Sequence, residues 1–176
     1  MPIQEPGPAR TSGDEDRLVA AARDGDRAAF GRLFERYAPM VHGLLLARVR
    51  PDVADDLVQE VFLAALQRLK TLRRASAAGA WLAMIARNLA VDHHRRQPRE
   101  PLHAAEPQAS DPRRAEAAEV LEAIGGLPEA YREPLVLRLV EGMTGPEISA
   151  RVGLTPDSVR VNLHRGMKLL RERLGI

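Results

Sequence analysis

Four polar residues near the end of one predicted helix have types and a spacing suited to nucleic-acid contacts. Asn88, Asp92, Arg95 and Arg96 recur at intervals that place them on one helix face. Asn and Asp side chains can hydrogen-bond to base edges, while arginines hold phosphates. This face therefore favours DNA binding.

Two neighbouring histidines, His93 and His94, interrupt this face and invite a metal-binding interpretation. Adjacent residues of a helix point about 100° apart. No acid or thiol completes a set of ligands with them. We expect no metal site, and no cofactor.

A second group of polar residues lies on the last predicted helix, which follows a short helix and a turn. Thr144 and Glu147 have capping-box spacing, Gly153 suits the turn, and Thr155 suits the next N-cap. This order is typical of a helix-turn-helix. The residues of the last helix that we expect at DNA are Ser158, Arg160, Val161, Asn162, His164, Arg165 and Lys168. A basic helix end can also simply complement its own dipole, but together with the turn pattern it predicts binding to duplex DNA.

Acidic residues crowd the first half of a third predicted helix: Asp55, Asp56, Gln59 and Glu60. Asp56 and Glu60 are one turn apart, where like charges slightly destabilise an isolated helix. Paired carboxylates could serve metal or acid–base chemistry, complement the helix dipole, or dock a basic partner surface. No constellation supports catalysis, so we expect a protein that is not an enzyme.

Composition excludes several other classes of protein. The 176 residues contain no cysteine, which rules out disulfide scaffolds, thiolate zinc sites and cysteine nucleophiles. Aromatic residues make up 3%, too few for a typical β-sandwich. No apolar run reaches the roughly 18 residues of a membrane span, and the first residues lack the apolar core of a signal peptide. We expect a cytoplasmic protein without membrane insertion.

The elements that must position these residues are all helical. Apolar periodicity predicts helices from Asp16 onward, from Pro51, and from about 80 to 96. The first helical stretch is interrupted at Asp24–Asp26, whose residues suit a turn and an N-cap. Prolines between 97 and 114 predict a linker. We therefore expect an all-α chain of two small helical domains: a disordered tail 1–15, a domain 16–97, a flexible linker 98–114 and a domain 115–176.

Two details of the predicted cores bear on function. The apolar stripe of the acidic helix is Leu57, Val61, Leu66 and Leu69. Trp81 could stack on a base, but its place beside Leu82 and Ile85 favours the core.

In this order, the motifs resemble bacterial RNA polymerase sigma factors of the small extracytoplasmic-function (ECF) group. The stretch Asp55–Phe62 is similar to the region 2 helix that contacts core polymerase, which adds Phe62 to the expected contacts. The stretch Trp81–Asp92 followed by Arg95-Arg96 resembles the helix that reads the promoter minus-ten element. The stretch Leu127–Arg171 is similar to region 4, the helix-turn-helix domain that reads the minus-thirty-five element.

This resemblance implies partners and control. The partners are core RNA polymerase, through its beta-prime clamp helices and beta flap, promoter DNA, and an anti-sigma factor. The function implied is promoter-specific transcription initiation in the bacterial cytoplasm, in response to a stress or envelope signal. Val161 and Asn162 depart from the family, which usually has a hydroxyl and a cation at these positions.

Two other classes stay open at this stage. A stand-alone helix-turn-helix regulator would explain the second domain but not the motifs of the first. A helical adaptor without a nucleic-acid role would leave the clustering of arginine unexplained.

Overall fold

The computed structural model describes residues 12–97 and 112–176, and within these ranges every regular element is a helix. This confirms the all-α prediction. Before the gap lie α1 (Ser12–Arg23), α2 (Arg27–Leu46), α3 (Pro51–Arg68) and α4 (Ala78–Arg96), with the short 3-10 turns η1 (Leu69–Thr71) and η2 (Ala75–Ala77). After the gap lie α5 (Pro112–Gly125), α6 (Glu129–Leu139), α7 (Gly145–Val152) and α8 (Pro156–Leu174).

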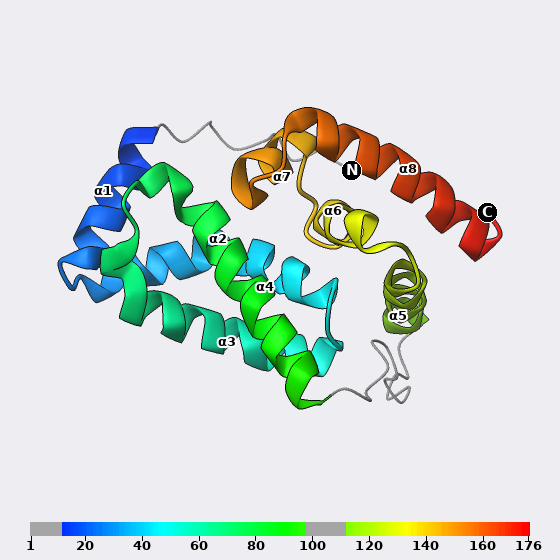
Figure 1. Ribbon diagram of the computed structural model, residues 1–176, viewed down its shortest axis with the longest axis horizontal. Coiled ribbons are helices and arrows are strands. Elements are labelled where there is room, and N and C mark those ends of the chain that lie inside the picture. The colour runs from blue at the N-terminus through cyan, green and yellow to red at the C-terminus, as the bar shows by residue number, and fades with distance from the viewer. Residues whose placement is uncertain (1–11, 98–111) are drawn as a thin grey trace.

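Helices α1–α4 form the amino-terminal bundle, in which α2 packs against each of the other three (Figure 1). Met40, Leu44 and Leu45 of α2 are fully buried at its centre. Residues next to the break before α2 cause it. Gly25 adopts φ 95°, and the Asp26 carboxylate caps α2 by accepting hydrogen bonds from the amides of Ala28 and Ala29. The predicted cap at this position is therefore confirmed.

Helices α5–α8 form the carboxyl-terminal unit, in which α8 contacts α5, α6 and α7. Leu135, Leu137 and Ile148 are fully buried in its core. The turn between α7 and α8 passes through Gly153 at φ 76°, a left-handed conformation that favours glycine. The predicted helix-turn-helix geometry is present.

The helix boundaries differ from the predictions at three points. α1 begins at Ser12, so residues 12–15 are helical and do not belong to a disordered tail. Asp14 and Glu15 complement the dipole of its first turn. α4 begins at Ala78, and α5 begins at Pro112, because proline is tolerated in a first helical turn. The rest of the predicted tail, 1–11, and of the predicted linker, 98–111, lie outside the described residues.

Two core predictions have different outcomes. The side chain of Leu66 is 51% exposed, so its placement in the apolar core stripe was wrong, while Leu57, Val61 and Leu69 are buried. Trp81 packs against the hydrophobic core, which confirms that interpretation.

The bundle and the unit pack directly against each other, which the sequence did not predict. α4 contacts α7, and α2 contacts α6. We call this contact the closed interface. Its residues are Gly43, Arg48, Gly79 and Arg87 of the bundle, and Glu133, Leu137, Glu141 and Arg151 of the unit. The two halves therefore share one continuous buried cluster.

Candidate functional site

A groove between α3 and α4 gathers most of the first predicted DNA-contacting group. Asn88, Asp92 and Arg95 line it, and Arg68 of α3 faces them from the other wall. Arg96 is exposed but does not line the groove. Arg95 lies 3.7 Å from Asp92, and both side chains are at least half exposed. Such an exposed ion pair exchanges easily for a phosphate or a base.

The groove also contains residues that the sequence reasoning missed. Arg68 adds a cation and Val91, 46% exposed, adds an apolar surface. Only the packing of α3 against α4 brings Arg68 to this place, and no local pattern indicates it. The Nε2 of the neighbouring His94 lies 2.7 Å from the backbone oxygen of Arg48, a contact that ties the end of α4 to the segment after α2.

The acidic residues of α3 lie on its solvent-facing side. Asp55, Asp56, Gln59 and Glu60 are all exposed. Asp55 lies 3.3 Å from His42 Nε2. This face is suited to a basic protein surface.

The expectation for Phe62 needs correction. Its side chain is 4% exposed and packs with the rings of Phe30 and Phe34. Phe62 lies two residues beyond the exposed Glu60, a spacing that places the two side chains on different sides of a helix. The ring of Phe62 therefore packs inside the bundle and offers almost no surface to a partner. In its place the structure exposes Leu63 and Leu66, 60% and 51% accessible, next to Gln59 and Glu60.

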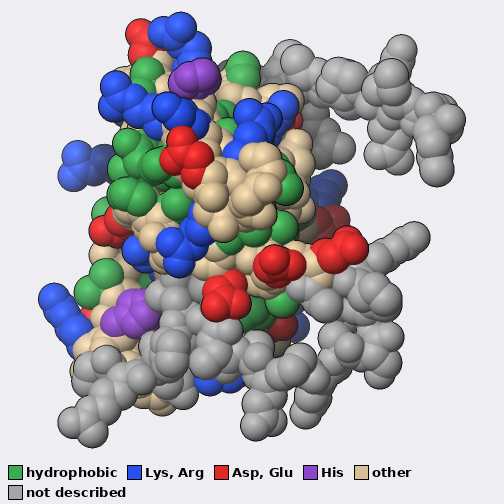
Figure 2. Space-filling view, turned by 90° about the vertical axis from the view of Figure 1, so that its right-hand side faces the viewer, with side chains coloured by type: hydrophobic (Ala, Val, Ile, Leu, Met, Phe, Trp, Pro, Cys, Tyr) green, Lys and Arg blue, Asp and Glu red, His purple; other side chains and the backbone are tan. Residues whose placement is uncertain are grey.

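The predicted contact residues of α8 share its outward face. Arg160, His164, Arg165 and Lys168 are exposed, Val161 is 37% exposed, and Asn162 is half-buried. Arg160 forms an ion pair of 3.2 Å with Asp157 between side chains that are 78% and 88% exposed. Figure 2 shows the side of the molecule that is on the right in Figure 1. Basic side chains gather in its upper part, at the height of α8 in Figure 1.

Capping fixes the orientation of both helix-turn-helix helices. The Thr144 hydroxyl accepts from the Glu147 amide, and the Glu147 carboxylate accepts from the Thr144 amide at 2.8 Å. These backbone and side-chain hydrogen bonds from Thr144 lower the pKa of Glu147. At α8, the Thr155 hydroxyl donates to Ser158 Oγ at 2.8 Å, so Ser158 serves the cap as well as the predicted DNA face.

A buried carboxylate holds the two halves together. Glu133 of α6 is 6% exposed and is the buried charged residue of the described chain. Arg87 donates to both of its oxygens, at 2.5 and 3.2 Å, and to the backbone oxygen of Val152. Arg48 lies 2.8 Å from Glu133 Oε2. Both arginines come from the amino-terminal bundle, so each ion pair crosses the closed interface.

His42 makes a second polar contact across the closed interface. Its Nδ1 lies 3.0 Å from Glu141 of the unit, and its Nε2 lies 3.3 Å from Asp55 of α3. The hydrogen bond with Glu141 raises the pKa of His42, and the charge of Asp55 adds to the effect against the opposing cost of burial. The acidic face of α3 is thereby connected to the carboxyl-terminal unit.

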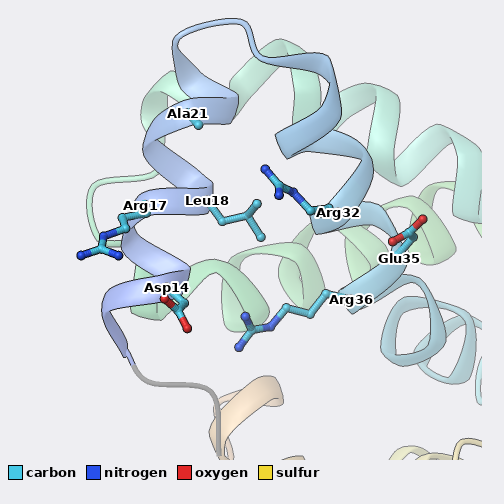
Figure 3. A pocket seen from close by; sticks show the side chains of 7 residues that line it. All are labelled: Asp14, Arg17, Leu18, Ala21, Arg32, Glu35 and Arg36. Carbon is cyan, nitrogen blue, oxygen red and sulfur yellow. The ribbon is translucent and has the colours of Figure 1, made fainter.

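A hollow between α1 and α2 contains none of the predicted residues (Figure 3). Arg32 and Arg36 point toward it from α2, and Asp14 lies on its α1 side (Figure 3). Arg36 also lies 3.6 Å from Glu15, whose carboxylate accepts a hydrogen bond from the Tyr37 hydroxyl. These contacts attach α1 to α2.

Residues 12–97 and 112–176 contain no group of three or more His, Asp or Glu side chains placed to hold a metal ion. None of their helices combines the length and the apolar character needed to cross a membrane.

Comparison with known proteins gives the same division of the chain. Residues 33–100 match sigma-70 region 2, and residues 117–170 match sigma-70 region 4. The chain is 37% identical to RNA polymerase sigma factor CarQ of Myxococcus xanthus, over 87% of this chain and 93% of CarQ. It is 33% identical to ECF RNA polymerase sigma factor SigD of Mycobacterium tuberculosis, over 90% of this chain and 83% of SigD.

Among solved structures, the fold is similar to that of CnrH in complex with the cytosolic domain of CnrY. CnrH is a sigma factor of Cupriavidus metallidurans. The TM-score is 0.68 at 29% identity, and the match covers 92% of this chain and 98% of that one. Members of the family are transcription initiation factors without enzymatic activity. With both regions matched in order and near-complete coverage of CarQ, the chain belongs to the ECF group of RNA polymerase sigma factors.

Proposed function

We propose that this ECF sigma factor acts in the bacterial cytoplasm by docking core RNA polymerase on α3 and reading promoter DNA with α4 and α8. The observation that carries the proposal is the separation of charge: exposed acids lie on α3, while exposed arginines lie on α4 and α8. Core polymerase would take the acidic face through its beta-prime clamp helices and the carboxyl-terminal unit through its beta flap. Leu63, beside Glu60, would add apolar contact area to the clamp-helix interface.

The groove between α3 and α4 would read the minus-ten element. Asn88 and Asp92 offer hydrogen-bonding groups, and Arg68 and Arg95 supply positive charge for the backbone phosphates. A base leaving the duplex costs a few kcal/mol of stacking and pairing, so contacts to extruded bases in this groove would offset that cost. The exposed face of α8 would read the minus-thirty-five element.

Control by an anti-sigma factor is the second part of the proposal. CnrH, the similar sigma factor, was solved with the cytosolic domain of a second protein bound. We expect this sigma factor to be bound by a comparable protein in uninduced cells and to be released by an envelope or stress signal. The bound form should not initiate transcription until the two proteins are separated.

In vitro transcription with purified core polymerase tests the proposal. Promoters are first found by mapping the start sites that appear when the chain is overexpressed. Adding the purified chain to core polymerase should then give initiation at these promoters and not at templates with scrambled minus-ten and minus-thirty-five elements. A stand-alone regulator would bind the DNA without conferring initiation on core polymerase, and that result would refute the proposal.

A further inference from the structure

The outward face of α8 has an apolar residue at its centre. Val159, Gly166 and Leu170 are the buried residues of this helix and lie on its core-facing side. Successive residues of a helix are about 100° apart, so Val161 points about 200° away from Val159 and almost directly opposite the core. Its side chain is 37% exposed, against 1% for Val159. The middle of the face that we expect at DNA therefore carries an isopropyl group.

The Val161 side chain takes no part in the core. Among the described residues of α8, those that are half-buried and pack against the hydrophobic core are Leu163, Met167, Leu169 and Leu174, and Val161 is not one of them. A single exposed valine needs no explanation on an ordinary surface. Val161, however, lies in the part of a recognition helix that meets base edges in the major groove.

Charged and polar side chains surround Val161. Asp157 lies one turn before it, and His164 and Arg165 lie one turn after it, all exposed. The neighbouring Arg160 forms an ion pair of 3.2 Å with Asp157. These groups can hydrogen-bond to phosphates and to the polar edges of bases. The apolar centre of the face must therefore meet a different kind of group.

The major groove offers one matching group for an isopropyl side chain. Guanine, adenine and cytosine present hydrogen-bond donors or acceptors there, and thymine adds a 5-methyl group. Against a G·C pair, valine would displace water from polar atoms without replacing the lost hydrogen bonds, which is unfavourable. Against thymine, the isopropyl and methyl groups would shield each other from water. The centre of the face is therefore suited to an A·T pair.

We propose that Val161 reads the 5-methyl group of a thymine in the minus-thirty-five element, so that the promoters of this sigma factor share an A·T pair at the position facing it. This inference rests on the proposed reading of DNA by α8. Asn162 is half-buried and points about 100° away from Val161, at the edge of the face. The hydroxyl that is usual in the family at position 161 can hydrogen-bond to several bases. Valine narrows that choice to thymine.

Replacing thymine by deoxyuridine tests this contact, because deoxyuridine keeps the base pair and lacks only the 5-methyl group. Each thymine of the minus-thirty-five element in a mapped promoter is replaced in turn, on both strands. Binding of each duplex is measured with holoenzyme assembled from the full chain and core polymerase. One replacement should weaken binding about fourfold, the loss expected for one buried methyl group. The other replacements should have much smaller effects.

Val161→Ala shows whether Val161 makes the contact. This variant should bind the thymine promoter about fourfold or more weakly, and it should no longer distinguish thymine from deoxyuridine at the sensitive position. Val140→Ala is the matched control, since it makes the same change at the C-cap of α6, where the side chain is 44% exposed. The control should distinguish the two bases as the parent does. Circular dichroism should show equal helix content in all three chains.

Each outcome decides a separate claim. If the parent holoenzyme binds every deoxyuridine promoter as tightly as the thymine promoter, no methyl group is read and the inference is overturned. If Val161→Ala retains the preference of the parent for thymine, another residue reads the methyl group and the role of Val161 is overturned. If scrambling the whole minus-thirty-five element leaves binding unchanged, the proposed function of α8 fails, and with it this inference.

Discussion

Glu133 and Arg87, 46 residues apart in sequence, form a two-pronged ion pair that joins α6 to α4. Arg87 immediately precedes Asn88, the first residue of the predicted minus-ten group. The same arginine therefore holds the carboxyl-terminal unit and adjoins the groove proposed to read DNA.

A double-mutant cycle should show that this pair is strongly coupled. Glu133→Gln and Arg87→Gln, alone and together, should give a coupling energy of about 0.5–3 kcal/mol in urea unfolding, because the pair is largely shielded from water. The exposed pair Lys168–Glu172, one helical turn apart at 4.0 Å, is the control and should give about 0.3–0.5 kcal/mol. A coupling no larger than the control would contradict the structural role of Glu133.

The stability of the chain should depend on pH through His42. Its pKa is raised from 6.5 by Glu141 and Asp55, so protonated His42 is favoured in the folded chain. The stabilisation is complete below the unfolded pKa and is lost as pH rises through the folded pKa. As pH rises from below 6.5 through the raised pKa of the folded chain, the free energy of unfolding of the parent should fall relative to that of His42→Gln. Parallel pH profiles would show that His42 does not contribute.

Charge reversal on α3 should abolish polymerase binding. Asp56→Lys with Glu60→Lys replaces two exposed acids and should leave helix content unchanged, because neither side chain is buried. Glu119→Lys with Glu122→Lys, two exposed acids of α5, is the control and should bind normally. Binding is measured by co-elution with core polymerase, and helix content by circular dichroism. Equal affinity of both double variants would reject the docking face.

Two arginines should affect DNA binding in different ways. Arg160→Ala should cost roughly 1–3 kcal/mol and relax specificity at one minus-thirty-five position. Arg96→Ala should weaken binding about equally for all sequences and reduce the salt dependence by about one unit of slope. Holoenzyme binding to a promoter library at several salt concentrations separates the two effects. Identical selectivity of parent and Arg160→Ala would remove Arg160 from base readout.

Loss of the α7 cap should loosen the helix-turn-helix. Thr144→Ala removes the hydroxyl that accepts from the Glu147 amide and should cost about 1 kcal/mol of stability. Thr144→Ser keeps the hydroxyl and should cost much less. Urea unfolding followed by circular dichroism measures both. A Thr144→Ala chain as stable as Thr144→Ser would show that the cap carries little of the stability of α7.

Much of the secondary structure depends on interactions between residues close in sequence, so it can be predicted from the sequence alone. Asp26, Thr144 and Thr155 cap helices as predicted, since a cap involves residues only a few positions apart. The same holds for the turn at Gly153 and for the order of acidic and basic helices. These features needed no knowledge of distant neighbours.

Contacts between segments far apart in the sequence could not be predicted from such local patterns. Nothing near Glu133 in the sequence indicates that Arg48 and Arg87 will surround it, nor does Gly43 reveal that Leu137 will approach it. Leu66 fits an apolar period but lies exposed, while Phe62 is turned into the core. Helix periodicity determines which residues share a face, but the packing of whole helices determines which face meets water, a partner or the other half of the chain.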